Sequence, residues 1–526
     1  MKPERLFIFF LFLSGLSSAP PLRIPIKITG SFGEYRNDHL HAGVDLSTYA
    51  STGHDVLAIK EGWLYRIKKR DTGEGNTVYL KHPDKTISVY AHLEDFSPKI
   101  EAFINQKKPF DIFPDTRISF EEGEVLGYTG ESGRGFPHLH LEIRSKLSKA
   151  LDNSMFIDGI KDRKSPVITN IELIPILREG DRINVEIKDN SPVEVEVPYP
   201  VGIAIEGYDL FDSSQAKCHI PEWKIFDSKD LIYHSRMKTI QHTRNYASAM
   251  HFIRDSTNLS PTRYLYKLYR DFTQQSPFIL KAKNNGILGP GLHKIRIEGL
   301  DFHGNSQEIL LSIKVRDSPV PKIKTYNGKH LFRKGPFELN LQKDGVSVDA
   351  RVRLTLLPLD FLKEKSPLLG LEIAPDYLFF TKKASLQYKT PVDGKEYFLR
   401  WNPVEKNWEP ALSEKAEGVL KTSITLPGKY LVARDTNPPS LDTSIQTLKA
   451  KRKTFYYIGA EDKESGIDPK SLDFQCNSNT LEAEFDPDRK WIRWSSIPCL
   501  SAQINLCDRV GNCLFQAVGE QERSPE

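Results

Sequence analysis

The sequence predicts an all-β protein, with an N-terminal antiparallel β-sheet domain followed by about three immunoglobulin-like β-sandwich modules. Short segments of alternating apolar and polar residues recur along the 526-residue chain, which contains 33 Gly, 34 Pro and 10% aromatic residues. Proline-bearing breaks interrupt these segments. Because proline cannot donate a hydrogen bond to a central strand, such breaks indicate linkers. The chain is also longer than one hydrophobic core normally supports, which favours several domains.

The first nineteen residues are typical of a secretory signal. Lys2 and Arg5 precede an apolar run at residues 6–13, and small residues follow up to Ala19. This order predicts cleavage near residue 19 and an exported mature protein. The apolar run is too short to cross a bilayer, and no later stretch reaches about 18 apolar residues, so we expect no membrane span. The net charge of +4 is small for this length and predicts no nucleic-acid partner.

Cysteine usage agrees with export. Four of the five cysteines lie close to the C-terminus, at Cys476, Cys499, Cys507 and Cys513, while Cys218 stands alone. Two disulfides are favoured for such a cluster in an oxidising compartment, with three pairings open. A zinc site made of the same four cysteines is the alternative, and the absence of any Cys-x-x-Cys pair disfavours it.

Two weak repeats mark the part of the chain that follows the N-terminal domain. Breaks at residues 164–167, 316–320 and 434–439 each carry proline, and alternating segments lead twice into Asp-x-x-Gly-Asn, at 301–305 and 508–512. A strand, turn and strand of this kind often ends a β-sandwich. The predicted divisions are a signal at 1–19, the N-terminal domain at 20–150, β-sandwich modules at 165–317 and 319–435, and a Cys-containing β module at 438–518.

The segment PHLHLEIR, residues 137–144, places two histidines one residue apart on a predicted strand. Successive side chains of a strand point to opposite faces, so His138, His140 and Glu142 share one face and three apolar residues share the other. The apolar face would pack on a core. The polar face would then meet solvent, a cleft or a metal, and paired histidines occur in both metal sites and proton shuttles.

The segment HLHAGVDLS, residues 39–47, offers complementary donors. On an extended chain His41, Gly43 and Asp45 project to one side, and the glycine leaves room beside the backbone. These two donors plus one histidine of the pair would give three protein ligands and a fourth position for water, as in catalytic zinc sites. Between the two segments lies VYAHL, residues 89–93, in which we expect His92 to share a face with Tyr90.

Five segments together resemble a known family. In chain order they are GSFGEYRNDHLHAGVDLS, GHDVLAIKEGWLYRI, GNTVYLKHPDKTISVYAHL, GEVLGYTGESG and PHLHLEIR. They are similar to the lysostaphin-like (LytM-like) zinc endopeptidases of bacterial cell walls, over about residues 22–144. The resemblance implies an antiparallel β-sheet with a groove over one zinc ion, which His41, Asp45 and His140 would hold. It implies His92 and His138 as the catalytic histidines. The segment at 94–122 is longer than the minimal family connection and is expected to roof or narrow the groove.

The resemblance implies an exported zinc metalloendopeptidase that hydrolyses peptide bonds in peptidoglycan cross-links or stem peptides. It places the protein in the periplasm, the cell envelope or the exterior of a bacterium, with cell-envelope partners for the C-terminal β modules. The alternative is a noncatalytic wall-binding or hydrolase-activating protein of the same fold, and a third reading is a surface adhesion or scaffold protein. Noncatalytic relatives typically lack a metal ligand, whereas this sequence has all of them, which favours the enzyme.

Overall fold

The computed structural model describes residues 19–519 with internal gaps. The gaps are 37–38, 71–72, 105–109, 134, 152–160, 177–181, 188–192, 243–246, 254–263, 273–274, 317–318, 321, 323–328, 344, 347–351, 359–366, 375–377, 379, 381, 390–393, 403–405, 417, 450–451, 453, 478, 482, 488, 496–497 and 500. The predicted signal at 1–19 therefore lies almost wholly outside the described residues. The described part of the chain contains no helix with the length and hydropathy needed to cross a membrane.

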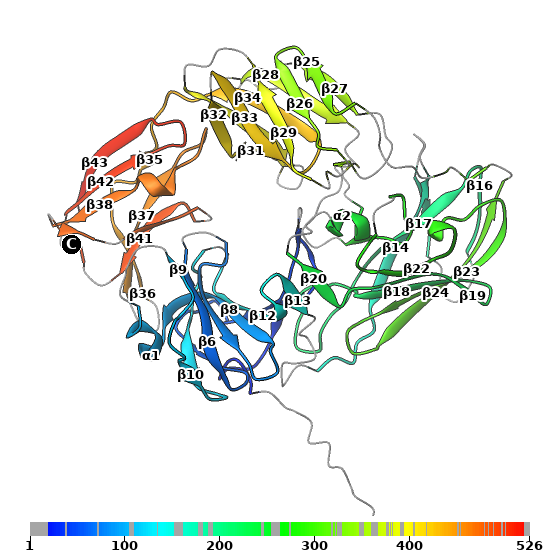
Figure 1. Cartoon of the computed structure of the whole chain (residues 1–526), viewed down its shortest axis with the longest axis horizontal. Coiled ribbons are helices and arrows are strands. Elements are labelled where there is room, and N and C mark those ends of the chain that lie inside the picture. The colour runs from blue at the N-terminus through cyan, green and yellow to red at the C-terminus, as the bar shows by residue number, and fades with distance from the viewer. Residues whose placement is uncertain are drawn as a thin grey trace, which may run out of the picture.

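The N-terminal part of the chain forms one antiparallel sheet with the strand order β1-β4-β12-β8-β7-β6-β10 (Figure 1). Strand β11 pairs with β5 and β8, β9 pairs with β6, and β13 extends the sheet beside β12. These strands are β1 (Ile28–Gly30), β4 (Val44–Ser47), β5 (Asp55–Leu57), β6 (Gly62–Lys69), β7 (Asn76–Lys81), β8 (Ile87–Phe96), β9 (Phe110–Ile112), β10 (Ser119–Phe120), β11 (Val125–Thr129), β12 (His138–Lys146) and β13 (Lys149–Leu151). A short helix, α1 (Pro98–Glu101), follows β8, and a hairpin of β2 (Tyr35–Arg36) and β3 (His39–Leu40) lies apart from the sheet.

Strand β12 has the two faces that the sequence predicts. Leu139, Leu141 and Ile143 lie in the hydrophobic core of the N-terminal sheet, and His138, His140 and Glu142 lie on the opposite face. The alternation of side chains therefore holds along this strand.

The segment at 94–122 was expected to roof the groove, but its described strands lie elsewhere. Strands β9 and β10 both pair with β6, which is three strands away from β12 in the sheet. Phe110 and Phe120 anchor them in the core of the N-terminal sheet. Residues 105–109 of this segment lie outside the described part.

The first β-sandwich follows the N-terminal sheet and encloses a core between two sheets. One sheet contains β14 (Val167–Pro175), β15 (Ile183–Val185), β17 (Val201–Tyr208) and β21 (Leu265–Lys267); the other contains β16 (Val193–Val197), β18 (Glu222–Asp227), β19 (Asp230–Arg236), β22 (Ile279–Ala282), β23 (Gly291–Leu300) and β24 (Ser306–Val315). Two further elements are β20 (Thr239–Gln241), which pairs with β13 of the N-terminal sheet, and α2 (Ala247–His251). Phe32, Leu40 and Ala42 also belong to the core of this sandwich, so the chain on both sides of the β2–β3 hairpin packs against it.

Two more two-sheet units complete the chain. The second sandwich pairs the sheet of β25 (Leu331–Lys334), β26 (Phe337–Asn340), β29 (Ala384–Tyr388), β32 (Ser413–Ala416) and β33 (Val419–Ile424) with that of β27 (Arg353–Leu357), β28 (Pro367–Ala374), β30 (Glu396–Asn402), β31 (Asn407–Ala411) and β34 (Gly428–Arg434). The third pairs the sheet of β35 (Ser440–Leu441), β36 (Gln446–Lys449), β37 (Thr454–Glu461), β40 (Glu484–Asp486) and β41 (Trp491–Ser495) with that of β38 (Asp473–Cys476), β39 (Asn479–Thr480), β42 (Ser501–Cys507) and β43 (Cys513–Gly519). The all-β prediction is therefore confirmed.

The third sandwich also carries the predicted disulfides. They join Cys476 to Cys499 and Cys507 to Cys513, which leaves Cys218 as a buried free thiol. The four C-terminal cysteines therefore form disulfides and not a zinc site.

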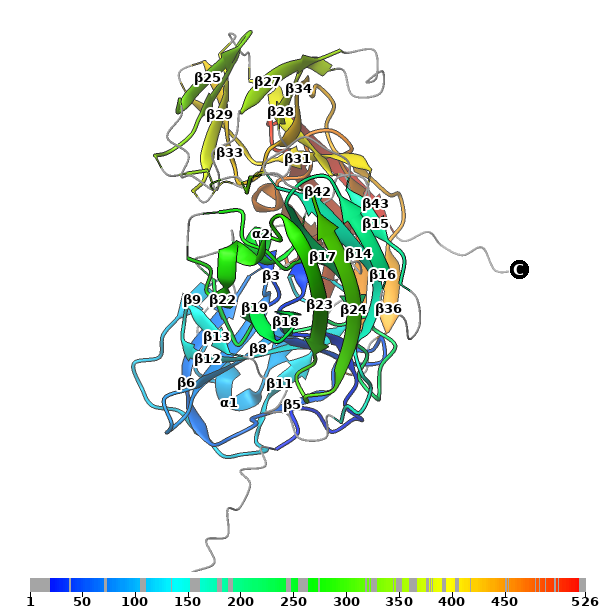
Figure 2. The ribbon, with the colours of Figure 1, turned by 90° about the vertical axis from the view of Figure 1, so that its right-hand side faces the viewer.

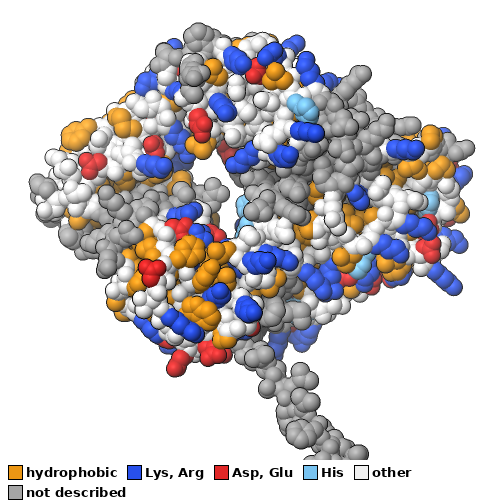
Figure 3. Space-filling view, viewed as in Figure 1, with side chains coloured by type: hydrophobic (Ala, Val, Ile, Leu, Met, Phe, Trp, Pro, Cys, Tyr) orange, Lys and Arg blue, Asp and Glu red, His pale blue; other side chains and the backbone are white. Residues whose placement is uncertain are grey.

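The sheets follow one another around a ring, so that the third sandwich returns to the N-terminal sheet (Figure 1). Two views place the second sandwich at the end of the molecule opposite the N-terminal sheet (Figures 1 and 2). An opening remains at the centre of the ring when side chains are drawn, and histidine side chains lie at its edge (Figure 3).

Candidate metal centre and active site

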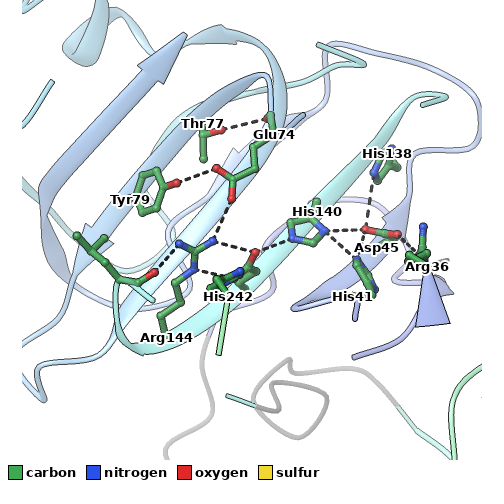
Figure 4. A network of polar contacts seen from close by, with 12 residues as sticks. Arg36, His41, Asp45, Glu74, Thr77, Tyr79, His138, His140, Arg144 and His242 are labelled. Carbon is green, nitrogen blue, oxygen red and sulfur yellow. Dashed lines mark hydrogen bonds and ion pairs between the residues drawn. The ribbon is translucent and has the colours of Figure 1, made fainter. Parts of the chain in front are cut away.

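Three donor atoms converge on one point of the N-terminal sheet: one from His41, just after β3, and two from the paired strands β4 and β12. Strand β12 pairs with β4 so that His140 lies directly opposite Asp45. His41 Nε2 lies 3.0 Å from Asp45 Oδ1 and 3.0 Å from His140 Nδ1, and His140 Nδ1 lies 2.9 Å from Asp45 Oδ1. All three residues are at least nine-tenths buried. The structure thus brings together the three metal ligands that the sequence predicts (Figure 4).

In both histidines, the ring nitrogen that faces away from the other donors already makes a hydrogen bond, and this bond sets the tautomer of the ring. His41 Nδ1 donates to the backbone carbonyl of Ser31 at 2.8 Å, and His140 Nε2 donates to Glu142 Oε1 at 3.1 Å. In a neutral imidazole the other nitrogen then carries a lone pair. Two lone pairs and a carboxylate oxygen therefore point at one another, and this arrangement favours a cation between them.

The pKa values of the two histidines shift in opposite directions. Burial lowers the pKa of His140, but hydrogen bonds with Asp45 and Glu142 outweigh it and raise the pKa to about 10. Burial lowers the pKa of His41 to about 4. Burial raises the pKa of Asp45, yet the neighbouring His41 and the hydrogen bond from His140 hold it well below its usual range. The three donors thus stabilise a single positive charge among them.

Close backbone approach explains the glycine of the first motif. A Cβ on Gly43 would lie 2.4 Å from the carbonyl oxygen of Leu141 and 2.9 Å from His140 Cε1. The room predicted beside Gly43 is therefore occupied by strand β12 and its histidine ring. Only Oδ1 of Asp45 faces the two histidines, because Oδ2 accepts a hydrogen bond from Arg36 Nη2 at 3.0 Å.

The side chain of His92 also points to this site, although simple alternation along the strand does not predict that direction. The expectation that Tyr90 and His92 share a face is wrong: Tyr90 lies in the core of the N-terminal sheet, where its hydroxyl accepts a hydrogen bond from the backbone of Ile59. His92 instead has a left-handed backbone with φ of 60°, and the pairing of β8 with β7 and with β11 shifts register beside it. Such a bulge redirects a side chain to the other face of a strand.

His92 and His138 lie side by side next to the three donors. Their ring centroids are 4.5 Å apart, and His138 Nε2 lies 3.7 Å from Asp45 Oδ1. The Nδ1 atoms donate to backbone carbonyls, that of His92 to Ser132 at 2.9 Å and that of His138 to Phe136 at 2.6 Å. Burial, together with the nearby His138 and His140, lowers the pKa of His92 to about 3. His92 is therefore neutral at pH 7 and carries a lone pair on Nε2.

A buried ionic network supports His140 from behind (Figure 4). Glu142 accepts from His140 and from Arg144 Nε at 2.6 Å, and Arg144 Nη2 also donates to Glu74 Oε1 at 3.0 Å. Burial raises the pKa of Glu142, but Arg144 outweighs it and holds the pKa well below its usual range. His242, which follows β20, lies 3.4 Å from Glu142. Glu142 thus orients a ligand and is not one of the three convergent donors.

The loop whose Ser132 carbonyl accepts a hydrogen bond from His92 also contacts the third sandwich. Glu131, next to Ser132, forms ion pairs with Arg493 at 2.8 Å and Arg489 at 2.5 Å from the third sandwich. Arg452 lies over the ring of Tyr128, 3.5 Å from its centroid. The N-terminal sheet and the third sandwich are therefore joined beside one of the candidate catalytic histidines.

Several supporting residues were not predicted from the sequence. These residues contact the donors or the partners of the donors, and they are Ser31, Arg36, Glu74, Arg144 and His242. The position of Arg144 could have been predicted from alternation, because Arg144 is the next residue after Glu142 on the polar face of β12. The position of His242 could not, since it lies a hundred residues from Glu142 in the sequence and follows β20, a strand that only the fold brings beside β13.

The donor set fits a zinc ion. A tetrahedral zinc with bonds of about 2.0–2.1 Å separates its ligand atoms by about 3.3 Å, close to the spacing of the three donors here. Two imidazoles and one carboxylate oxygen suit zinc better than calcium or magnesium, which prefer oxygen alone.

Comparisons with known proteins find relatives of the N-terminal domain. The model of Peptidase family M23 matches residues 39–110. Sequence relatives include the DD-carboxypeptidase/endopeptidase Mpg of Neisseria meningitidis serogroup B and of Neisseria gonorrhoeae, each 33% identical over 106 residues. The aligned segment is 20% of this chain and 20% of each relative.

Two solved structures are also similar. The catalytic domain of the M23 protein EnpA from Enterococcus faecalis is 22% identical, with a TM-score of 0.18, over 24% of this chain and 85% of that chain. A zinc-containing peptidase from Vibrio cholerae is 24% identical, with a TM-score of 0.17, over 24% of this chain and 35% of that chain. The family match and the sequence relatives confirm the predicted family resemblance of the N-terminal domain.

Proposed function

Because residues 39–110 match peptidase family M23 and lie within the lysostaphin-like domain, we propose that the chain is a zinc metalloendopeptidase of peptidoglycan. The convergence of His41, Asp45 and His140, with both imidazole tautomers set by outer hydrogen bonds, is the observation that carries the proposal. The peptide substrate is the cross-links or stem peptides of the wall. The printed activity of the Mpg relatives, DD-carboxypeptidase and endopeptidase, supports this substrate class.

His41, Asp45 and His140 would hold the zinc ion, and Arg36 would keep Asp45 bound through one oxygen. Bound zinc lowers the pKa of a coordinated water from 15.7 towards about 7 and polarises a substrate carbonyl. The remaining chemistry falls to His92 and His138, whose Nε2 atoms are left available by the hydrogen bonds at Nδ1. One of them accepts a proton from the attacking water and passes it to the leaving amine, while the other donates a hydrogen bond to the developing oxyanion.

The protein acts outside the cytoplasm in this proposal. The two disulfides of the third sandwich support an oxidising compartment, and the signal-like first nineteen residues support export. The periplasm, the cell envelope and the exterior of a bacterium are all consistent with these features. The three sandwiches would position the peptidase on the wall or on cell-envelope partners.

The decisive experiment is digestion of purified peptidoglycan by the full mature chain. We expect new amino and carboxyl termini in stem or cross-bridge peptides, identified by mass spectrometry, and we expect a zinc chelator to abolish them and added zinc to restore them. Binding to peptidoglycan without any product would support the noncatalytic alternative. Neither product nor binding would support the adhesion or scaffold reading.

A further inference from the structure

A second group of buried acidic side chains lies where the N-terminal sheet meets the first sandwich. Asp162 belongs to the segment between β13 and β14, Asp209 follows β17, and Asp301 follows β23. One carboxylate oxygen of each lies within 4.8 Å of the others. Their exposed fractions are 7%, 0% and 6%. Three separate parts of the chain thus bring like charges together away from solvent.

The carboxylates of this cluster lack the partners that buried charges require. Both carboxylate oxygens of Asp209 and Oδ2 of Asp162 are buried and have no hydrogen-bond partner. Among the described residues, His303 Nδ1 lies 4.0 Å from Asp162 Oδ2 and balances its charge only when the imidazole is protonated. Burial and the neighbouring Asp162 and Asp301 raise the pKa of Asp209 to about 8. A buried carboxylate without a partner costs several kcal/mol, so a bound cation is the expected compensation.

The third carboxylate is held rigidly and is aimed by its own turn. Asp301 Oδ1 accepts hydrogen bonds from the backbone N–H groups of His303 and Asn305, both at 2.8 Å, and Oδ2 accepts one from Asn305 Nδ2 at 2.6 Å. Asn305 Nδ2 also donates to the backbone carbonyl of Asp162 at 3.2 Å. The Asp-x-x-Gly-Asn turn therefore binds the linker segment and orders two of the three acidic residues.

The same Asp-x-x-Gly-Asn turn recurs in the third sandwich, but the carboxylates beside it have hydrogen-bond partners. Asp508 accepts from the backbone of Asn512 at 2.8 Å, and Asn512 Nδ2 donates to the carbonyl of Asp435 at 3.2 Å. Asp462 occupies the place of Asp209, directly after a strand, but its Oδ1 accepts a hydrogen bond from the backbone of Gly466 at 2.7 Å. This second cluster has no carboxylate oxygen that is buried without a partner among the described residues, and we draw no site from it.

We propose that Asp162, Asp209 and Asp301 bind a calcium ion at the junction of the N-terminal sheet and the first sandwich. The three side chains offer only oxygen donors, which calcium prefers. Two oxygens on one calcium ion are at most about 5 Å apart for bonds of 2.3–2.6 Å, which matches the spacing of the cluster. This site is separate from the proposed peptidase function and does not depend on it.

The ion would hold together the contacts that join the two units. Phe211, two residues after Asp209, lies in the core of the N-terminal sheet, and Phe302, next to Asp301, packs against the cores of both units. The Phe302 ring lies 6.5 Å from that of Phe32, the residue that follows Ser31. Ser31 in turn accepts the hydrogen bond from His41. Calcium would thus stabilise the junction on which a zinc ligand depends, without touching that ligand.

The test is a calcium titration of the full mature chain with its zinc in place, by isothermal titration calorimetry. We expect the wild type to bind Ca²⁺ with a dissociation constant of about 1 mM or tighter and its melting temperature to rise on binding. Asp209→Asn should bind one calcium ion fewer per chain and lose that part of the rise. Asp115→Asn, at an exposed position, is the matched control and should behave as the wild type does.

Two results would overturn the proposal. One is the absence of calcium binding to the wild type at concentrations up to about 10 mM. The other is an Asp209→Asn protein that binds as many calcium ions as the wild type, with equal affinity. If shared protons and not a cation neutralise the cluster, Asp209→Asn should be at least as stable as the wild type whether or not calcium is present, and that outcome would also refute the site.

Discussion

Two buried groups of possible metal ligands in this molecule differ in how many of their polar atoms have hydrogen-bond partners. In the group of His41, Asp45 and His140, the outer atom of every side chain has a hydrogen-bond partner, and only the inner atoms are free to meet a cation. In the group of Asp162, Asp209 and Asp301, three oxygens have no hydrogen-bond partner. The first group is preorganised for one ion in one geometry, as catalysis requires. The second offers only oxygens, which suits a flexible structural cation.

Elsewhere in the molecule, a buried carboxylate is neutralised by arginine side chains. Glu131 is 5% exposed and is compensated by Arg489 and Arg493 from the opposite end of the chain. The molecule therefore buries carboxylates against a proposed zinc ion, against a proposed calcium ion and against arginine. The following experiments separate these cases.

The largest expected effect is on turnover and concerns the two histidines that do not hold the ion. His92→Ala and His138→Ala should each retain zinc, because neither is one of the three convergent donors. Cleavage of peptidoglycan should fall by about 10²–10⁴-fold, the usual contribution of a general acid or base. Zinc content and the rate of peptide release measure the two effects separately. His293→Ala in the first sandwich is the control, and full activity in either site variant would refute this division of roles.

The arginine-compensated carboxylate should respond in stability. Arg493→Met removes one partner of the buried Glu131 and leaves Arg489 in place. We expect a loss of about 3 kcal/mol at the contact between the N-terminal sheet and the third sandwich, the lower end of the range for breaking a buried ion pair. Differential scanning calorimetry would show an earlier first transition.

A control and a double variant sharpen this result. Lys463→Met changes an exposed lysine, 80% exposed, and should leave the transition unchanged. Glu131→Gln combined with Arg493→Met should cost less than the sum of the single changes, because the two side chains interact directly. Strict additivity would show that the ion pair contributes nothing.

The network behind His140 should affect the affinity for zinc. Glu142→Gln keeps the size of the side chain but weakens the acceptor for His140 Nε2, and loss of such an outer partner typically lowers metal affinity by about 10–100-fold. Competition with a zinc chelator measures this change. Glu121→Gln, on an exposed part of the N-terminal domain, should match the wild type. Unchanged affinity in Glu142→Gln would mean that Glu142 does not support the ligand.

The last expected effect depends on pH and concerns a buried histidine with no hydrogen-bond partner. Both ring nitrogens of His251 in α2 are buried without a hydrogen-bond partner, and burial lowers its pKa to about 3. The unfolded chain takes up a proton near pH 6.5 and the folded chain does not, so stability is present above pH 6.5 and is lost as pH falls towards 3. The loss amounts to at most about 1.4 kcal/mol for each pH unit below 6.5.

His251→Phe should therefore lose less stability than the wild type between pH 6.5 and 4, as measured by denaturant unfolding at each pH. His219, whose ring centroid lies 5.7 Å from that of His251 and whose pKa burial also lowers, would continue to contribute to the acid sensitivity of the variant. Equal slopes for variant and wild type would show that His251 is not buried in its neutral form.

The fold class could be predicted from local alternation, whereas the choice of His41, Asp45 and His140 as the donor set came from the family resemblance. Alternation along PHLHLEIR separates the core face of β12 from the polar face, and Asp45 lies in β4, with His41 four residues earlier, just after β3. The orientation of His92 could not be predicted in this way, since a left-handed residue at a bulge reverses the alternation. The cluster of three carboxylates could not be predicted for another reason: Asp162, Asp209 and Asp301 are far apart in sequence, and only the folded chain brings them together.

The most direct test of the central claim is the zinc content of the purified mature chain and of His140→Ala. The wild type should contain one zinc ion per chain by elemental analysis, and His140→Ala should contain almost none while it keeps its folded β-sheet signature in circular dichroism. Loss of zinc together with loss of peptidoglycan cleavage is the predicted result. A folded His140→Ala protein that holds zinc as the wild type does would contradict the account.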